Sequence, residues 1–305
     1  MYEIEYCDNP DRVELHKAGI INLPNFEQEF DLRADQLDTF VFLVDMFKIV
    51  DSCAKDLEIV TIDESKDFWK INKTLFNFIN AVYGFKEYVN NFVPTLREIT
   101  EKYYARKEKH EMYRFVCDFR DYIIHQSVII KDYLPSKEEI LFDIKEVKDL
   151  ITEYTYPQEK YKDKAMWFGK RIDALTLYTV VIKGKKYLSM KHVVESCMNE
   201  IMEMESEIVG YLLENELKSI IQWFIGYIPK INNRYMYAFF VDKENGPESV
   251  REPNFLLEDF VRKMIKSFGE KSDFCCGLID FLDEVGYTFF YDGQCDINEF
   301  IINAK

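Results

Sequence analysis

The chain has 305 residues, of which 48% are hydrophobic, and it carries a formal net charge of −16. This length predicts about two domains, and so acidic a chain does not bind along a nucleic-acid duplex by bulk charge, although it can hold a local basic site. The content of only 11 Gly and 8 Pro disfavours a turn-rich sandwich or barrel.

The cysteines and the apolar segments indicate a cytoplasmic protein that does not enter a membrane. The seven cysteines form no C-x-x-C pair and are odd in number, as expected of reduced thiols in the cytosol. The N-terminus lacks the basic and apolar regions of a signal peptide. No segment approaches the ~20 consecutive apolar residues of a membrane span.

The first part of the chain predicts two long helices after an N-terminal segment, residues 1–31, that we leave unassigned. Asp31 is a plausible N-cap for a helix over about 32–57. A second helix is expected to begin after Asp63 or Ser65, because apolar residues recur there at intervals of three and four. Pro94 is expected to kink or restart this helix.

A third helix is predicted around the sequence RFVCDFRDYIIHQSVII, residues 114–130. One apolar stripe at helical spacing contains Met112, Phe115, Val116, Phe119, Tyr122 and Ile123. Arg120 and His125 flank the opposite side, about 140° apart and roughly 7.5 Å along the axis. Cys117 and Ile124 lie between them and Tyr113 lies near Arg120, so this side can also pack, for example against a second copy of the helix.

The rest of the chain predicts further helices with minor β structure. Ser136 and Glu139 form a capping-box pattern that favours a helix over 138–151, although its apolar core could also form a short strand. A hairpin is expected within 175–190, a long helix over about 191–227, one strand within 231–247, and two helices and a tail from Phe255 onward.

The predicted fold is mainly α, an antiparallel helical bundle with minor β hairpin elements and a small C-terminal α/β part. The candidate domain boundary lies near Asn232 and Asn233, where the long helix has ended. It separates a bundle over 32–230, with a basic, partly β insertion at about 155–190, from a C-terminal α+β region over 231–305.

Arg120 and His125 are suited to metal-independent cleavage of RNA. A histidine titrates near neutrality and can move a proton, whereas an arginine stays charged and offers a bidentate fork to phosphate. One helix alone holds the two side chains awkwardly. Two such helices that meet across a twofold axis would bring two arginines and two histidines into one groove.

The R-x-x-x-x-H pattern of Arg120 and His125, with polar Asp121 after the arginine, resembles the HEPN superfamily of helical-bundle proteins. The resemblance covers roughly residues 32–134, or up to about 227 if the long helix belongs to the bundle. It implies a homodimer with a composite site, endoribonuclease activity without metal or other cofactor, and a role as a toxin or in antiviral defence. Arg120 would stabilise phosphate, His125 would be the acid or base, and Asp121 and Gln126 would orient them.

A basic segment is the candidate RNA-contacting surface. Residues 160–192 hold nine Lys or Arg against two acids, with aromatic residues interleaved. The RNA-binding candidates are Lys162, Lys164, Lys170, Arg171, Lys183, Lys185 and Lys186. The alternative is a solvated basic face that pairs with the acidic helix after it, which holds Glu195, Glu200, Glu203, Glu205 and Glu207.

Two functions from different classes therefore stay open. The first is a HEPN-type endoribonuclease that acts on RNA, with an antitoxin or regulatory protein as a further partner. The second is a catalytically inactive helical protein that binds or scaffolds a partner. The strong negative charge and the unexplained C-terminal region favour the second.

Overall fold

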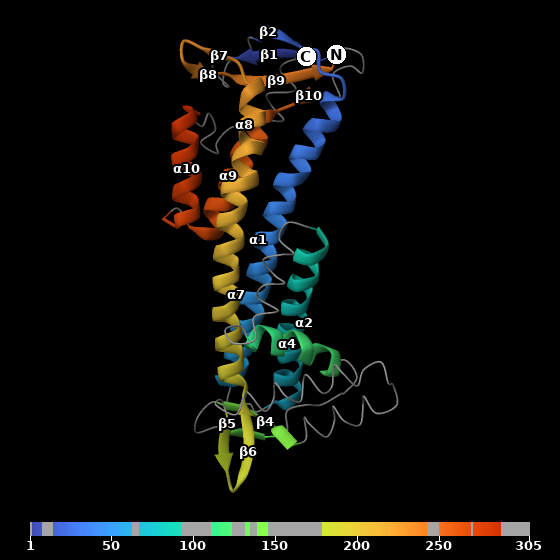
Figure 1. Cartoon of the computed structure of the whole chain (residues 1–305), viewed down its shortest axis with the longest axis vertical. Helices are drawn as coiled ribbons and strands as arrows, with labels where there is room; N and C mark the ends of the chain where they lie inside the picture. Colours follow the sequence, from blue (N-terminus) through green and yellow to red (C-terminus); the bar gives the residue numbers. More distant parts are fainter. Residues whose placement is uncertain are drawn as a thin grey trace. The chain divides into compact units, whose positions relative to one another are not determined.

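The computed structural model describes residues 2–7, 15–62, 67–92, 111–123, 132–134, 139–145, 179–242, 250–269 and 271–287. About 71% of these residues are helical and the strands form small antiparallel sheets, which confirms the mainly α prediction (Figure 1). None of the helices described is long and apolar enough to cross a membrane.

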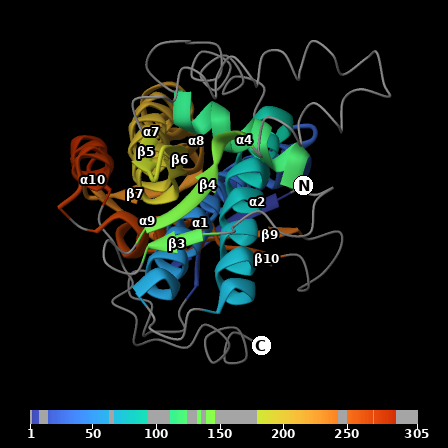
Figure 2. The ribbon, with the colours of Figure 1, turned by 90° about the horizontal axis from the view of Figure 1, so that it is seen from below.

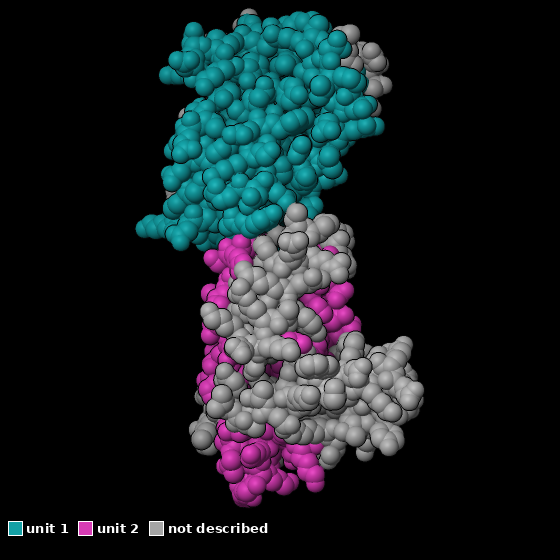
Figure 3. All heavy atoms as spheres, in the orientation of Figure 1, with its two compact units in different colours: residues 1–44, 209–305 teal, residues 45–208 magenta. Residues whose placement is uncertain are grey.

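The chain divides into two compact units, and the first of them is discontinuous in sequence. Unit 1 consists of residues 1–44 and 209–305, and unit 2 consists of residues 45–208 (Figure 3). The sequence-predicted boundary near Asn232 and Asn233 falls within unit 1. These two asparagines instead form the turn of a hairpin, with φ angles of 51° and 62°.

Unit 2 combines helices with a four-stranded antiparallel sheet. Its helical parts come from α1 (Phe26–Ile62), α2 (Phe68–Phe92), α4 (Glu111–Ile123) and α7 (Met190–Leu212). The sheet has the strand order β3-β4-β6-β5 and contains β3 (Asp132–Leu134), β4 (Glu139–Asp143), β5 (Thr179–Ile182) and β6 (Lys185–Ser189).

Buried aromatic and aliphatic side chains make the core of unit 2. Phe47 of α1 packs on Phe85 of α2 with ring centroids 4.5 Å apart. Phe78, Val82 and Val89 continue the buried stripe of α2 at helical spacing. The side chain of Asp67 accepts hydrogen bonds from the amides of Trp69 and Lys70, so it caps α2 a few residues after the predicted start.

Unit 1 packs helices on a sheet assembled from both of its sequence segments. The strand order is β10-β9-β1-β2, with β1 (Tyr2–Cys7), β2 (His16–Ile21), β9 (Tyr237–Asp242) and β10 (Val250–Arg251). The remaining elements are a π-helical segment (Leu213–Leu217), α8 (Lys218–Tyr227), β7 (Lys230–Ile231), β8 (Arg234–Tyr235), α9 (Pro253–Phe268) and α10 (Asp273–Val285).

An aromatic cluster joins the two sequence segments of unit 1. Phe26 contacts the rings of Trp223, Tyr227 and Phe240 at centroid distances of 5.2–5.7 Å. Arg251 of β10 adds polar contacts between the same two segments. Its guanidinium donates to the carboxylates of Glu27 and Asp31 of α1 and lies 5.1 Å from the Phe30 ring. Aromatic burial of this kind contributes strongly to stability.

The helix and hairpin predictions are largely confirmed, with one element corrected. The hairpin expected within 175–190 is present as β5 and β6, and the long helix is present as α7, the π-helical segment and α8. The helix favoured over 138–151 is wrong at residues 139–143, which form β4, whereas the alternative of a short strand in this segment is confirmed. Leu141 pairs with Ser189 of β6, so sheet pairing outweighs the local capping pattern.

The N-terminal region forms two strands where no element is predicted from the sequence. β1 and β2 occupy residues 2–7 and 16–21, and α1 begins at Phe26 rather than at about residue 32. Asp31 therefore lies inside α1 and is not its N-cap; it bonds to Arg251 instead. The alternation of Tyr2, Ile4 and Tyr6 with two glutamates is a period-two signal that could have identified β1.

Candidate functional site

Helix α4 carries Arg120 and is buried on more than one side. Met112, Phe115, Val116 and Phe119 of the predicted stripe are all buried. The side chains of Tyr122 and Ile123 lie outside the described residues. Tyr113 and Cys117, on the other apolar side, are also buried within the single chain. Their burial therefore requires no second copy of the helix.

The N-terminal end of α4 is held by a glutamate from α7. The backbone N–H of Tyr113 donates to one carboxylate oxygen of Glu200 at 2.7 Å, and that of Met112 donates to the other at 3.2 Å. The first N–H groups of a helix have no partner within the helix, and its dipole favours a negative charge there. Glu200 therefore fixes the start of α4 from a position 87 residues away in sequence.

Arg120, near the other end of α4, lies against α2. Its guanidinium carbon is 4.2 Å from the centroid of the Tyr83 ring, a cation–π arrangement, and the side chain is half-buried. Lys86 also approaches this ring, at 5.2 Å. Helix α4 is thus held by α7 at one end and by α2 near the other, and Figures 1 and 2 both draw it next to α2.

The other residues of the predicted catalytic set are described only in part or not at all. The backbone of Asp121 belongs to α4, but its side chain lies outside the description. His125 and Gln126 also lie outside the described residues. The geometry between Arg120 and His125 is therefore still a prediction from the sequence.

Three of the predicted RNA-binding lysines lie at the tip of the β5–β6 hairpin. Lys183, Lys185 and Lys186 are exposed there, and Lys185 is 4.0 Å from a carboxylate oxygen of Asp143 in β4. Lys183 and Gly184 form the turn with φ angles of 49° and 78°. Lys162, Lys164, Lys170 and Arg171 lie outside the described residues.

The acidic residues of α7 have roles that local sequence patterns did not indicate. Glu200 binds the end of α4. Burial, together with the charge of Asp51, raises the pKa of Glu205 to about 7. Burial also raises the pKa of the Cys197 thiol well above its ordinary value, and Cys117 lies nearby. This thiol is therefore a packed core group and not a reactive one.

Sequence reasoning missed Tyr83 and Glu200 for different reasons. Tyr83 follows Trp69 by fourteen residues and Phe76 by seven, so the heptad spacing of aromatic residues off the buried stripe was a detectable signal. No local signal marks Glu200, because its partners are in a distant part of the sequence. Within the described ranges, no cluster of three or more His, Cys, Asp or Glu is arranged to hold a metal ion.

Comparisons with known proteins give no relative for this chain: no family model, no curated protein and no solved structure matches it.

Proposed function

We propose that this protein is a metal-independent endoribonuclease of HEPN type, which acts in the cytoplasm as a homodimer. The resemblance of Arg120, Asp121 and His125 to the R-x-x-x-x-H pattern is its basis. The observation that supports it most is the position of Arg120 on a helix held from two sides by Glu200 and Tyr83. A guanidinium fixed in this way is pre-organised for phosphate, because less side-chain freedom is lost on binding.

The proposed reaction is an internal transfer that consumes no water. The ribose 2′-oxygen attacks the adjacent phosphorus, the bond to the 5′-oxygen breaks, and the products are a 2′,3′-cyclic phosphate and a 5′-hydroxyl. His125 accepts the proton of the 2′-hydroxyl or gives one to the departing 5′-oxygen. Arg120 stabilises the negative charge that develops on the phosphorane oxygens.

The test is cleavage of labelled RNA in EDTA by the full chain and its variants. We expect His125→Ala to lower the cleavage rate at least 100-fold, the typical contribution of an acid–base group. Arg120→Lys should also lower it, since an ammonium keeps the charge but lacks the bidentate fork. His192→Ala is the matched control, because His192 is an exposed histidine of α7 that pairs with Glu195. Full activity of His125→Ala would refute the assignment.

A second candidate function is a catalytically inactive helical protein that binds or scaffolds a partner, such as an antitoxin or regulatory protein. The contact between Arg120 and Tyr83 favours it, because a half-buried arginine on an aromatic ring also has a purely structural role. In that case the purified protein leaves RNA intact, and Arg120→Ala lowers the urea midpoint of unfolding because the contact with Tyr83 is lost.

A further inference from the structure

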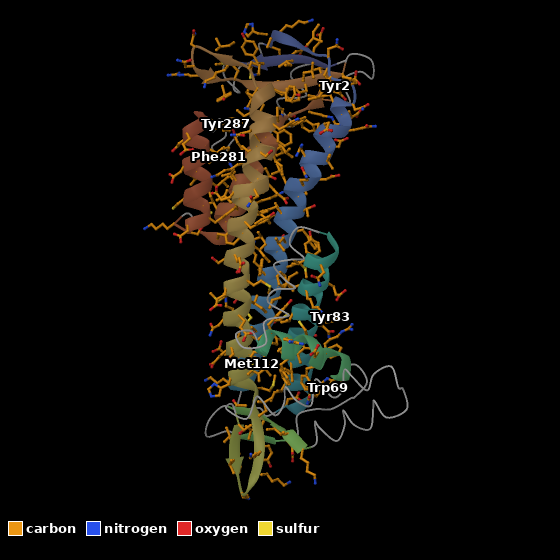
Figure 4. All side chains as sticks on the ribbon, viewed as in Figure 1. Tyr2, Trp69, Tyr83, Met112, Phe281 and Tyr287 are labelled. Atoms are coloured by element: carbon orange, nitrogen blue, oxygen red, sulfur yellow. The ribbon has the colours of Figure 1, made fainter. Side chains whose placement is uncertain are left out.

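An aromatic stripe runs along the outer face of α2. Trp69, Phe76 and Tyr83 are spaced by seven residues, so they lie nearly in line, with about 10.5 Å between successive side chains along the axis. Trp69 is 72% exposed and Phe76 is 41% exposed, whereas the buried stripe with Phe78 and Val82 faces the opposite way. Figure 4 labels Trp69 and Tyr83 on α2.

This face leads from an exposed tryptophan to the candidate active site. Trp69 stands at the first turn of α2, Phe76 follows two turns later, and Tyr83 holds the guanidinium of Arg120 at 4.2 Å from its ring. A ligand that follows the stripe therefore arrives at the arginine proposed to bind phosphate. All of these residues belong to unit 2.

The exposed polar residues of α2 next to Trp69 and Phe76 are basic or neutral, although the chain as a whole is strongly acidic. Asp67 caps the start of the helix, and Glu87 lies on this face four residues after Tyr83. Lys70 and Lys73 are exposed beside Trp69, and Asn77 is exposed beside Phe76. Helix α2 holds three lysines and one glutamate, a local charge of +2 in a chain of −16. The stripe thus combines π-faces with nearby cations, as an anionic ligand with aromatic bases requires.

We propose that the outer face of α2 binds single-stranded RNA, with Trp69 and Phe76 as stacking platforms and Lys73 as a contact to the backbone. The inference rests on the proposed function, for which it names the substrate class and the path of the strand to Arg120. Unpaired bases stack on aromatic rings without sequence preference, and nearby cations contact the phosphates. Lysine is depleted at the centres of protein interfaces, so RNA fits this face better than a second copy of the chain.

Binding of RNA is measured separately from cleavage. The full chain with His125→Ala serves as the parent, and the probe is a labelled single-stranded RNA of about 12 nucleotides, within the site sizes of stacking platforms. We expect Trp69→Ala and Phe76→Ala each to weaken binding about tenfold. Trp69→Phe, which retains a π-face, should stay within about twofold of the parent, whereas Trp69→Leu should behave as Trp69→Ala does.

Phe42→Ala is the matched control, because Phe42 is a 50% exposed aromatic residue on α1. It should leave the affinity unchanged. The same sequence as a duplex should bind more weakly than the single strand, since its bases are already stacked. Helical content and the urea midpoint should be unchanged in Trp69→Ala, because an exposed side chain contributes little to stability.

Several results would overturn the inference. One is that Trp69→Ala and Phe76→Ala bind RNA with the same affinity as the parent. Another is that the parent binds no RNA. A third is that the two variants lose self-association while their RNA affinity is unchanged. Cleavage by the wild-type chain distinguishes this failure from that of the proposed function. If the wild type cuts RNA and all variants bind RNA equally well, only the proposed path along α2 is refuted. If RNA binding depends on Trp69 but the wild type never cuts RNA, only the nuclease activity is refuted.

Discussion

Glu205 shows how the environment of one residue sets a pH dependence that its sequence context does not indicate. It lies on α7 among other glutamates that are solvated or bind elsewhere, yet its pKa is raised to about 7 by burial and then by the charge of Asp51. The native state therefore retains a proton that the unfolded chain releases near pH 4.5.

Glu205 is expected to lower stability as the pH rises from about 4.5 to 7. Since the native state binds more protons than the unfolded state in this window, the free energy of unfolding falls with pH, by roughly 1–3 kcal/mol in total. Glu205→Gln, which cannot ionise, should therefore be more stable than wild type at pH 8 and equal to it at pH 4. Urea unfolding at the two pH values measures the difference.

Glu203→Gln is the control for this prediction, because Glu203 is an exposed glutamate on the same helix. It should change stability by less than about 0.5 kcal/mol at either pH. A stabilisation of Glu205→Gln that is equal at pH 4 and pH 8 would contradict a raised pKa as its cause.

The candidate catalytic residues were predictable from the sequence only as a motif. Arg120 and His125 are visible because their spacing on a helix is a local property. The pairing of Tyr83 and Glu200 with the helix of Arg120 is not visible in this way, since both residues come from other helices and meet α4 through tertiary packing. Residue types at a fixed local spacing can suggest a site, but they do not identify the side chains that support it.

At the scale of elements, α4 depends on contacts made by α2 and α7. It has 13 described residues, and isolated helices of this length are marginal in water. Its buried stripe and the carboxylate of Glu200 at its start are the tertiary interactions that stabilise it. A change at Glu200 should therefore alter the helix that carries the candidate site without altering any residue of that site.

Glu200→Ala should destabilise the protein by about 1–2 kcal/mol, because two helix N–H groups lose a charged acceptor. Glu200→Gln keeps one oxygen acceptor but not the charge, so its cost should be smaller. The measurement is the urea midpoint of each variant. Glu203→Ala, on the same helix, is the control. An equal loss of stability in Glu200→Ala and Glu203→Ala would mean that the contact of Glu200 with α4 contributes nothing specific.

The sequence predicts best those helices whose hydrophobic pattern repeats over many turns. The stripes of α2, α7 and α9 recur over many turns, and chance patterns rarely imitate such a repeat. For the short strand β4 the sequence favours a helix and offers the strand only as an alternative, because five residues carry little periodic information. The β1 strand pairs with β9, and the paired residues Tyr2 and Asp242 are 240 positions apart, so no local pattern specifies such a partner.

At the scale of the molecule, unit 1 is closed by contacts between distant parts of the sequence. Arg251 bonds to Glu27 at 2.8 Å across 224 residues, and it also bonds to Asp31. Its side chain is mostly shielded and lies on the Phe30 ring. A forked arginine–carboxylate contact with such packing contributes more than an exposed surface pair.

Arg251→Ala should lower the free energy of unfolding by about 1–3 kcal/mol, since it removes both the ion pairs and the contact with Phe30. A double-mutant cycle of Arg251→Ala with Asp31→Ala should give a coupling energy of about 1 kcal/mol that weakens in high salt. The exposed pair of Lys48 and Asp45 on α1 is the matched control, with a coupling energy close to zero. Equal coupling in the two pairs would contradict a special role for Arg251.

The discontinuity of unit 1 sets an order of assembly during translation. Residues 1–44 leave the ribosome first, but their strand and aromatic partners begin only at residue 209. At 5–20 residues per second, synthesis of residues 45–208 takes roughly 10–30 s. Throughout that interval the nascent chain exposes Phe26 and Phe30 without Trp223 or Phe240. By its end, α2, α4 and the Glu200 side chain that binds α4 have all been synthesised. The helix that carries Arg120 can therefore be assembled well before the sheet of unit 1 is complete.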